Sequence, residues 1–282
     1  MGFERILDAN IIEGLKKESL YCDYLLNDIK NGKVFPAIRK NEIHFYYKGG
    51  RLFKYTAQGF LTNIFYIPVF PKDGDKEGDV NEINLCKLKL IEKFTEAYED
   101  IKRRCKEYNM GSESAGVAEL YEKYSYITSL DNIVLLDIEL VLLSQDEDKG
   151  TDRIDILLLN KESGVLQAVE AKLYENNELK GKPPAVISQI KRYQDNIEES
   201  KDSILSAYNN YIKIVNNLFE LNLCPIESIN PNVNLIYFGF DTPQKQSKKF
   251  KEIKDGLKGI SNVLSIGSAS NANLSQVFSC LT

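Results

Sequence analysis

Histidine is almost missing from this chain, since His44 is the only one among 282 residues. Catalytic chemistry that relies on histidine pairs or triads is therefore excluded. The excluded classes are zinc hydrolases, HD-type phosphohydrolases, HNH-type nucleases and hydrolases with a serine–histidine–aspartate triad. Any catalysis by this protein must instead use carboxylates, lysine, tyrosine or a hard metal ion.

Cysteines are few and scattered, and long apolar runs are absent. The five cysteines are odd in number and form no CxxC pair, which favours reduced thiols in a cytoplasm over a disulfide framework or a zinc site. No apolar run approaches the roughly 20 residues that a membrane span requires, and no signal peptide is apparent at the start. We therefore expect a cytoplasmic protein that makes no membrane contact.

The composition is that of an ordinary globular protein, with 43% hydrophobic and 27% charged residues. The length suits one large domain or two modest ones. The formal net charge is −5, which argues against a protein that binds nucleic acid over its whole surface. A local basic groove remains compatible with that charge.

Residues 1–84 predict an N-terminal α+β module that contains an aromatic hairpin. Helical spacing of apolar residues extends over residues 3–29. Two aromatic-rich strands, IHFYY and RLFKY, then flank the glycine turn Lys48–Gly50, which is a strong hairpin signal. The aromatic and basic side chains suit either base stacking in a recognition module or a small sheet that buries one aromatic face.

Residues 85–110 predict an amphipathic helix that connects the two halves of the chain. Its apolar residues recur at the three–four spacing of a short coiled coil. They are Ile91, Phe94, Tyr98, Ile101, Cys105 and Tyr108. This apolar stripe could pair two subunits in a homodimer through the 85–108 helix, or it could dock the helix on its own domain. The stripe is too short to distinguish between these two interpretations.

The stretch Thr151–Tyr174 predicts two apolar strands joined by the polar turn Asn160–Gly164. Charged residues interrupt both strands: Asp155 lies in the first, Glu170 and Lys172 in the second. Antiparallel pairing around the turn sets Asp155 opposite Glu170, to within one register step, and directly opposed residues have Cβ atoms roughly 4.5–5.5 Å apart. Two carboxylates at this separation repel by about 3 kcal/mol, so a proton, a lysine or a metal ion must compensate them. Lys172 supplies part of the compensation, and a hard divalent cation would supply the rest.

The elements around this hairpin follow a definite order. From Ser112 the sequence predicts a helix, three strands, a helix, a strand, a helix and a last strand. The helix after the hairpin starts near Ala185, and Asp202 is expected to cap a second helix beyond it. Gln189 and Tyr193 lie four residues apart and therefore share one face of the helix that starts near Ala185.

These features resemble the PD-(D/E)xK nuclease superfamily. The matching residues are Asp155, the E-x-K motif Glu170–Lys172, and the Q-x-x-x-Y motif formed by Gln189 and Tyr193, which is typical of the RecB-like branch. Ile154 stands where the name-giving proline would be. The resemblance implies a restriction-endonuclease-like αβββαβ core, a mixed central sheet flanked by helices, over residues 111–282.

The resemblance also implies a metal site for Mg²⁺ or Mn²⁺. Asp155 and Glu170 would be its ligands, with the Ala171 carbonyl completing the inner shell. Lys172 would orient the attacking water and stabilise the charge that develops on the phosphate. The family also uses an acid on the preceding helix, for which Glu119 is the first choice, Glu122 the second and Glu113 the third.

The implied function is hydrolysis of phosphodiester bonds in nucleic acid, with DNA as the expected substrate and defence or repair as natural settings by analogy. Gln189 and Tyr193 would position the scissile strand or the catalytic lysine. Together with Arg153 and Arg192, they would also contact the nucleic acid.

Simpler interpretations stay open at this point. Asp155 and Lys172 form a plain buried ion pair in one of them, and Gln189 and Tyr193 are ordinary helix-surface residues in another. Glu119 as a solvated helix acid is a third. The intact acid–acid–lysine set favours a nuclease, whereas the acidic net charge favours a nuclease-like fold that binds nucleic acid or protein without turnover.

Overall fold

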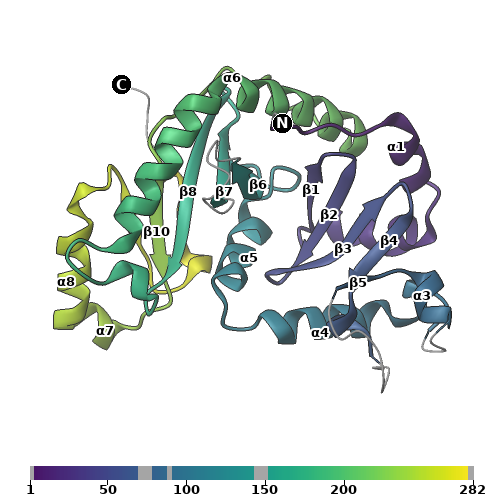
Figure 1. Cartoon of the computed structure of the whole chain (residues 1–282), viewed down its shortest axis with the longest axis horizontal. Coiled ribbons are helices and arrows are strands. Elements are labelled where there is room, and N and C mark those ends of the chain that lie inside the picture. Colours follow the sequence, from purple (N-terminus) through teal and green to yellow (C-terminus); the bar gives the residue numbers. More distant parts are fainter. Residues whose placement is uncertain (1–2, 69–77, 88–90, 143–151, 279–282) are drawn as a thin grey trace.

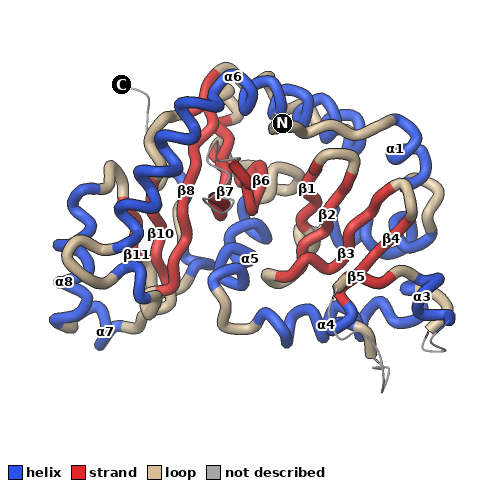
Figure 2. The backbone as a smooth tube through the Cα atoms, in the orientation of Figure 1, coloured by secondary structure: helices blue, strands red, loops and turns tan. Residues whose placement is uncertain are grey.

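The structure is a computed structural model that describes residues 3–68, 78–87, 91–142 and 152–278. It has mixed α/β architecture, with two β-sheets flanked by helices (Figure 1). The sheets come from the two halves of the sequence, and helix α5 (Glu113–Tyr124) lies between them (Figure 2). The expected mixed α/β class is therefore confirmed. Within the described ranges, no helix combines the length and apolar character that would let it cross a membrane.

The N-terminal half forms a five-stranded antiparallel sheet whose strands lie in chain order. The strands are β1 (Phe35–Arg39), β2 (Glu42–Tyr47), β3 (Gly50–Thr56), β4 (Gly59–Asn63) and β5 (Asp79–Val80). The hairpin between β2 and β3 turns through Lys48 and Gly49, whose φ angles are 49° and 92°. Positive φ at both central residues is what a tight two-residue hairpin turn requires, so the predicted hairpin is confirmed.

Short helices precede this sheet and cover its aromatic face. They are α1 (Ala9–Leu15), the π-helix Leu20–Leu25 and α2 (Leu26–Lys30). Tyr21 of the π-helix contacts Phe45 of β2, with ring centroids 6.4 Å apart. Phe45 and Phe53 are fully buried. The aromatic residues of the hairpin therefore form a core, the second of the two uses that the sequence allowed.

The connecting segment is not the single helix that the sequence predicted over residues 85–110. Helix α3 (Glu82–Lys87) and helix α4 (Tyr98–Asn109) are separate, and residues 91–93 between them are not helical. Phe94 begins a 3₁₀ turn, Phe94–Ala97, and its N–H donates to Glu82 Oε1 at 2.6 Å. The backbone N–H that a continuous helix would bond internally is thus bound by a carboxylate instead.

The apolar stripe of the connecting segment packs within the chain. Tyr98 stacks on Phe53 of β3 with ring centroids 6.2 Å apart, and the tilted ring of Phe94 packs against Phe53 with centroids 5.3 Å apart. Ile101 and Cys105 are fully buried on the same side of α4. Docking on the N-terminal sheet therefore covers most of this stripe, although Tyr108 is 61% exposed. The homodimer through the 85–108 helix stays a prediction.

The C-terminal half forms the second sheet, in the order β11-β10-β8-β7-β6. Strands β6 (Ile133–Leu142), β7 (Asp152–Asn160) and β8 (Val165–Leu173) form an antiparallel meander. Strands β10 (Asn234–Phe238) and β11 (Val263–Ser265) run parallel to β8, and the two-residue strand β9 (Ser228–Ile229) also pairs with it. Between β8 and β10 the chain passes through helix α6 (Ala185–Phe219).

Helix α6 is one continuous helix of 35 residues, so the break expected at Asp202 does not occur. Its buried face continues through that point because Ile197, Ile204 and Tyr208 all lie in the core. Helices α7 (Thr242–Gln246) and α8 (Lys248–Gly256) follow β10 on the outer side of this sheet (Figure 1).

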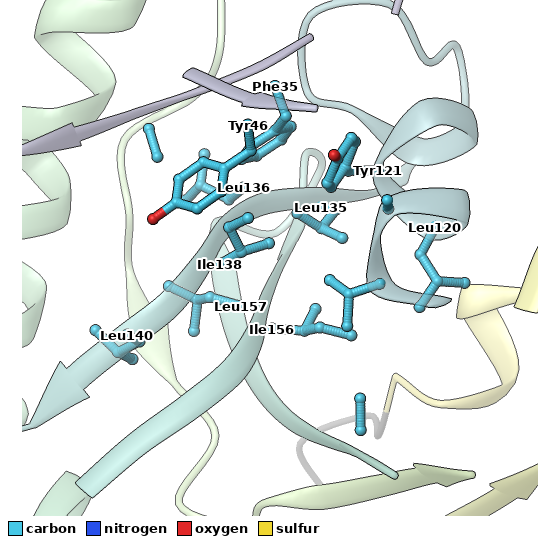
Figure 3. Close-up of a cluster of buried hydrophobic side chains, with 14 of the residues drawn as sticks. Phe35, Tyr46, Leu120, Tyr121, Leu135, Leu136, Ile138, Leu140, Ile156 and Leu157 are labelled. Atoms are coloured by element: carbon cyan, nitrogen blue, oxygen red, sulfur yellow. The ribbon is translucent and has the colours of Figure 1, made fainter. Parts of the chain in front are cut away.

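Helix α5 joins the two halves of the molecule. Tyr121 of α5 stacks on Phe35 of β1, with ring centroids 5.2 Å apart. Figure 3 shows these two rings beside Tyr46 of β2 and the β6 side chains Leu135 and Ile138. On the opposite side, Gly116 of α5 lies against the Phe238 ring so closely that an added Cβ would be only 2.0 Å away. The two sheets therefore share one core through α5.

A buried charged cluster adds a second connection between the halves. Asp137 of β6 is fully buried and pairs with Arg39 of β1 at 2.8 Å and with Arg5 at 3.2 Å. Tyr208 of α6 donates a further hydrogen bond to Asp137 at 2.7 Å. A buried carboxylate is stable only when its lone pairs are satisfied in this way. The cluster therefore fixes the N-terminal segment and β1 against the second sheet.

Candidate active site

The charged residues of the Thr151–Tyr174 stretch meet at one end of the β7–β8 hairpin. The register pairs Ile156 with Val169 and closes through the turn after Asn160, as the sequence predicted. One further step in this register places Asp155 opposite Glu170. Asp155 Oδ2 accepts a hydrogen bond from the Ala171 N–H at 2.9 Å.

Asp155 and Glu170 are neighbouring carboxyl groups, of which Glu170 is buried and Asp155 is half-buried. Glu170 is only 1% exposed, and the negative charge of Asp155 acts on its carboxyl group. Burial, followed by the negative charge of Asp155, raises the pKa of Glu170 to about 9. Burial also raises the pKa of Asp155 to about 6, although the Ala171 N–H and Lys172 act in the opposite direction. The pair therefore retains a proton at neutral pH unless a cation replaces it.

Lys172 lies between two carboxylates. Its Nζ is 2.7 Å from Glu170 Oε1 and 2.7 Å from Glu178 Oε2. Burial alone would lower the pKa of Lys172, but Glu170 and Glu178 raise it above its usual value. Lys172 is therefore a cation at neutral pH. Its pairing with Glu170 rather than Asp155 differs from the plain Asp155–Lys172 ion pair that the sequence left open.

Gln189 and Tyr193 face this site from helix α6. The Gln189 Nε2 group donates to the Tyr193 hydroxyl at 2.7 Å, and that hydroxyl donates to the Arg153 carbonyl of β7 at 2.8 Å. Burial, followed by the charge of Glu170, raises the pKa of Tyr193. Tyr193 is 2% exposed. The two residues therefore tie α6 to β7 beside Asp155, and they are not ordinary helix-surface residues.

Of the three acids considered on α5, Glu113 lies nearest the pair. It lies in the first turn, and its charge contributes to the raised pKa of Asp155. Its Oε2 accepts the Leu173 N–H at 2.8 Å, and both of its oxygens accept from Asn176 Nδ2 at 3.0 Å. Residues on a helix rise about 1.5 Å each, so an acid later on α5 lies farther from this end of the sheet.

The first and second choices for this acid bond elsewhere. Glu119 accepts hydrogen bonds from Ser268 Oγ at 3.2 Å and from the Ser270 N–H at 2.9 Å. Glu122 pairs with Lys48 of the β2–β3 turn at 2.6 Å. The order of preference drawn from the sequence is therefore corrected, because the start of α5, set by the Ser112 cap, is the part that meets the end of β8.

A pocket of 260 Å³ opens beside Asp155 and is lined by both halves of the chain. The N-terminal sheet contributes Tyr46 and Gly49 to its wall, and the second half contributes Ser112, Glu113, Ser114, Val117, Tyr121, Ile138, Glu139, Arg153 and Asp155. The pocket is therefore completed by the β2–β3 hairpin, which lies far from Asp155 in the sequence.

Glu139 is a residue of this pocket that the sequence reasoning missed. Its Oε2 accepts the Tyr46 hydroxyl at 2.8 Å, and its Oε1 lies 3.5 Å from Arg153 Nη1. Its φ angle is 52°, an uncommon conformation for a residue other than glycine and one found at functional sites. An acid within a mostly apolar strand was the available signal, the same one that singled out Asp155.

The remaining expected contacts to nucleic acid lie on the surface. The Arg153 side chain is 58% exposed, and its guanidinium group faces Glu139. Arg192 is exposed on α6. The expected role of the Ala171 carbonyl as a metal ligand also stays a prediction, since the contact that the structure gives for Ala171 is made by its N–H.

The site offers a small set of oxygen donors to a divalent cation. Among the described residues, no group of three or more His, Cys, Asp or Glu side chains converges as a ready metal-binding cluster. The Asp155–Glu170 pair nevertheless presents a suitable carboxylate pair, because Glu170 Oε2 is buried and accepts no hydrogen bond within the described chain. Mg²⁺ is commonly bound by one or two carboxylates and retains several waters. The pair therefore fits such an ion.

Comparison of the chain with protein-family models, curated proteins and solved structures finds no match in any of the three.

Proposed function

We propose that this protein is a Mg²⁺- or Mn²⁺-dependent nuclease that hydrolyses phosphodiester bonds, with DNA as its substrate. The observation that carries the proposal is the buried Lys172–Glu170 ion pair at 2.7 Å, with the half-buried carboxyl group of Asp155 opposite Glu170 in the β7–β8 register. Two neighbouring acids, one buried and one half-buried, are costly for stability alone. Such an arrangement is typical of sites where the acids serve a reaction.

The order of the elements supports the same proposal. Helix α5, the antiparallel meander β6–β7–β8, helix α6 and the parallel strand β10 follow one another along the chain. This is the order of the αβββαβ core of restriction-endonuclease-like proteins, which the PD-(D/E)xK motifs imply. Asp155 on β7, Glu170 on β8 and Gln189 on α6 occupy the corresponding elements.

Asp155 and Glu170 would hold the metal ion. When bound, the ion would acidify a water molecule and polarise the phosphate that the water attacks. Lys172 carries a positive charge that would stabilise negative charge on the phosphate oxygens. The hydrogen bonds from Gln189 to Tyr193 and from Tyr193 to the Arg153 carbonyl would keep β7 and the carboxylate of Asp155 in place.

A nuclease-like fold that binds without turnover is the second candidate. The observation in its favour is that no three-residue metal cluster is formed within the described ranges. The two candidates differ in one measurable property, because only the nuclease shortens or nicks its substrate. Binding of the same substrates without cleavage would favour the second candidate.

The test is incubation of the purified protein with linear and circular double-stranded DNA, single-stranded DNA and RNA, each with Mg²⁺ or Mn²⁺. We expect cleavage of DNA that falls at least about 100-fold in Lys172→Ala and Asp155→Ala. The matched control is Lys161→Ala, a lysine at the turn of the same hairpin whose Nζ donates to the Ser129 carbonyl at 3.2 Å. Identical behaviour of wild type and Lys172→Ala on every substrate would refute the proposal.

A further inference from the structure

The turn that follows β8 contacts both the lysine and the helix acid of the proposed site. It contains Asn176 and a 3₁₀ helix, Asn177–Leu179, which leads toward α6. Glu178 Oε2 lies 2.7 Å from Lys172 Nζ. Asn176 Nδ2 donates to both carboxylate oxygens of Glu113 at 3.0 Å. Neither Asn176 nor Glu178 belongs to the motifs that suggested the function.

A single side chain couples the two contacts. While its amide nitrogen bonds to Glu113, Asn176 uses its Oδ1 to accept the Glu178 N–H at 2.9 Å, and so caps the 3₁₀ helix. The position of the Glu178 backbone therefore depends on the position of Glu113. A continuous path runs from Glu113 through Asn176 and Glu178 to Lys172.

The turn is anchored on both sides of Glu178. Leu179 is fully buried. Lys180 Nζ donates to Asn177 Oδ1 at 2.8 Å and to the Glu175 carbonyl at 3.0 Å, which closes the turn on itself. The Glu178 carboxylate therefore projects from a fixed backbone.

We propose that the turn Asn176–Glu178 is a positioning element, in which Glu178 holds Lys172 in place for phosphodiester hydrolysis and Asn176 holds Glu113. This inference rests on the proposed function. Lys172 has a long flexible side chain, and its other carboxylate partner, Glu170, is also a proposed metal ligand. When Glu170 binds a metal ion, its carboxylate interacts less strongly with Lys172. The carboxylate of Glu178 would then keep the Lys172 ammonium group oriented.

The burial of the two partners explains why this contact matters more than a surface ion pair. The Lys172 side chain is 8% exposed, whereas the Glu178 side chain is 46% exposed. Pairs between two exposed side chains contribute little. A buried ammonium group, in contrast, requires a partner, and Glu178 reaches it from the solvent side of the site. Glu178 touches Lys172 and is not itself a catalytic residue.

The inference is tested with Glu178→Gln, which keeps the shape of the side chain and removes its charge. The matched control is Glu175→Gln in the same turn, because Glu175 pairs with Lys249 and does not contact Lys172. We expect kcat for DNA cleavage to fall about 10- to 100-fold in Glu178→Gln, the range seen when a supporting partner of an active site is removed. We expect KM and the unfolding temperature to stay near wild type, and Glu178→Asp to recover part of kcat.

The outcomes separate the inference from the function on which it rests. If wild type cleaves and Lys172→Ala does not, but Glu178→Gln equals wild type in kcat, the positioning role is refuted and the nuclease stands. An equal loss of kcat in Glu175→Gln would also refute the positioning role. A general effect of removing negative charge from the turn would then explain the loss in both variants. If wild type cleaves none of the substrates, the proposed function fails and the inference falls with it.

Discussion

Replacing Glu170 with glutamine should change how the stability of the metal-free protein depends on pH. Glu170 is buried near Asp155, and burial together with the charge of Asp155 raises its pKa from 4.5 to about 9. Between these values the folded protein holds a proton on Glu170 that the unfolded chain has released. A rise in pH therefore favours unfolding in this window, and the stabilising proton is lost as pH approaches the folded-state pKa.

The magnitude follows from the linkage between proton binding and folding. One proton difference changes the free energy of unfolding by about 1.4 kcal/mol for each pH unit. From pH 6.5 to 8.5, wild type should lose about 2–3 kcal/mol, or roughly 4–8 °C in unfolding temperature for a chain of this size. Asp155 adds little here, because its pKa is raised only to about 6 and its proton is lost mostly below this window.

The assay is thermal unfolding followed by circular dichroism at several pH values, with a chelator present. Glu170→Gln cannot titrate, so its unfolding temperature should fall much less over the same range. The control is Glu175→Gln, an exposed carboxyl group whose pKa is lowered by Lys249, so that it titrates outside the window. Equal slopes of unfolding temperature against pH for wild type and Glu170→Gln would refute the assignment of the proton to this pair.

Added Mg²⁺ should stabilise wild type more at pH 8.5 than at pH 6.5, since a cation competes with the proton.

Two further predictions concern α5 and the hairpin turn beside it. Gly49→Ala should destabilise the protein by at least about 1 kcal/mol more than Gly59→Ala in denaturant unfolding. Both glycines have positive φ, but a Cβ at Gly49 would lie 2.6 Å from the Ala115 nitrogen, whereas Gly59 has no described atom within 4 Å; equal losses would contradict this close packing. In the cleavage assay, Glu113→Gln should lower the rate about 10- to 100-fold, and Glu119→Gln should leave it near wild type. A larger loss in Glu119→Gln than in Glu113→Gln would instead favour Glu119, the first choice from the sequence.

Patterns that depend on neighbours in the chain were predicted correctly. The turn Asn160–Gly164 and the alternation of apolar residues fixed the β7–β8 register, and with it the meeting of Asp155 and Glu170. The helix predicted from Ser112 is also present as α5, and Ser112 Oγ caps it by accepting the Ala115 N–H at 3.1 Å. These features follow from local hydrogen bonding and side-chain periodicity, which the sequence displays directly.

Patterns that depend on packing between distant segments were predicted less well. The 85–110 segment has the apolar spacing of one helix, but Glu82 and the buried ring of Phe94 divide it. Helix α6 continues past Asp202 because its apolar face remains covered by the core. The spacing of apolar residues does not show which part of the protein will bury them. Burial against that part decides where the helix ends.

The sequence by itself determined that the chemistry cannot rely on histidine, and that two acids and a lysine meet at one end of a hairpin. Only the tertiary structure decided which further groups reach them. Glu113, Asn176 and Glu178 come from two segments that the fold brings to the end of β8, and Tyr46 comes from the other sheet. The reason is physical: local patterns fix the direction of side chains along one element, whereas contacts between elements depend on how the whole core packs.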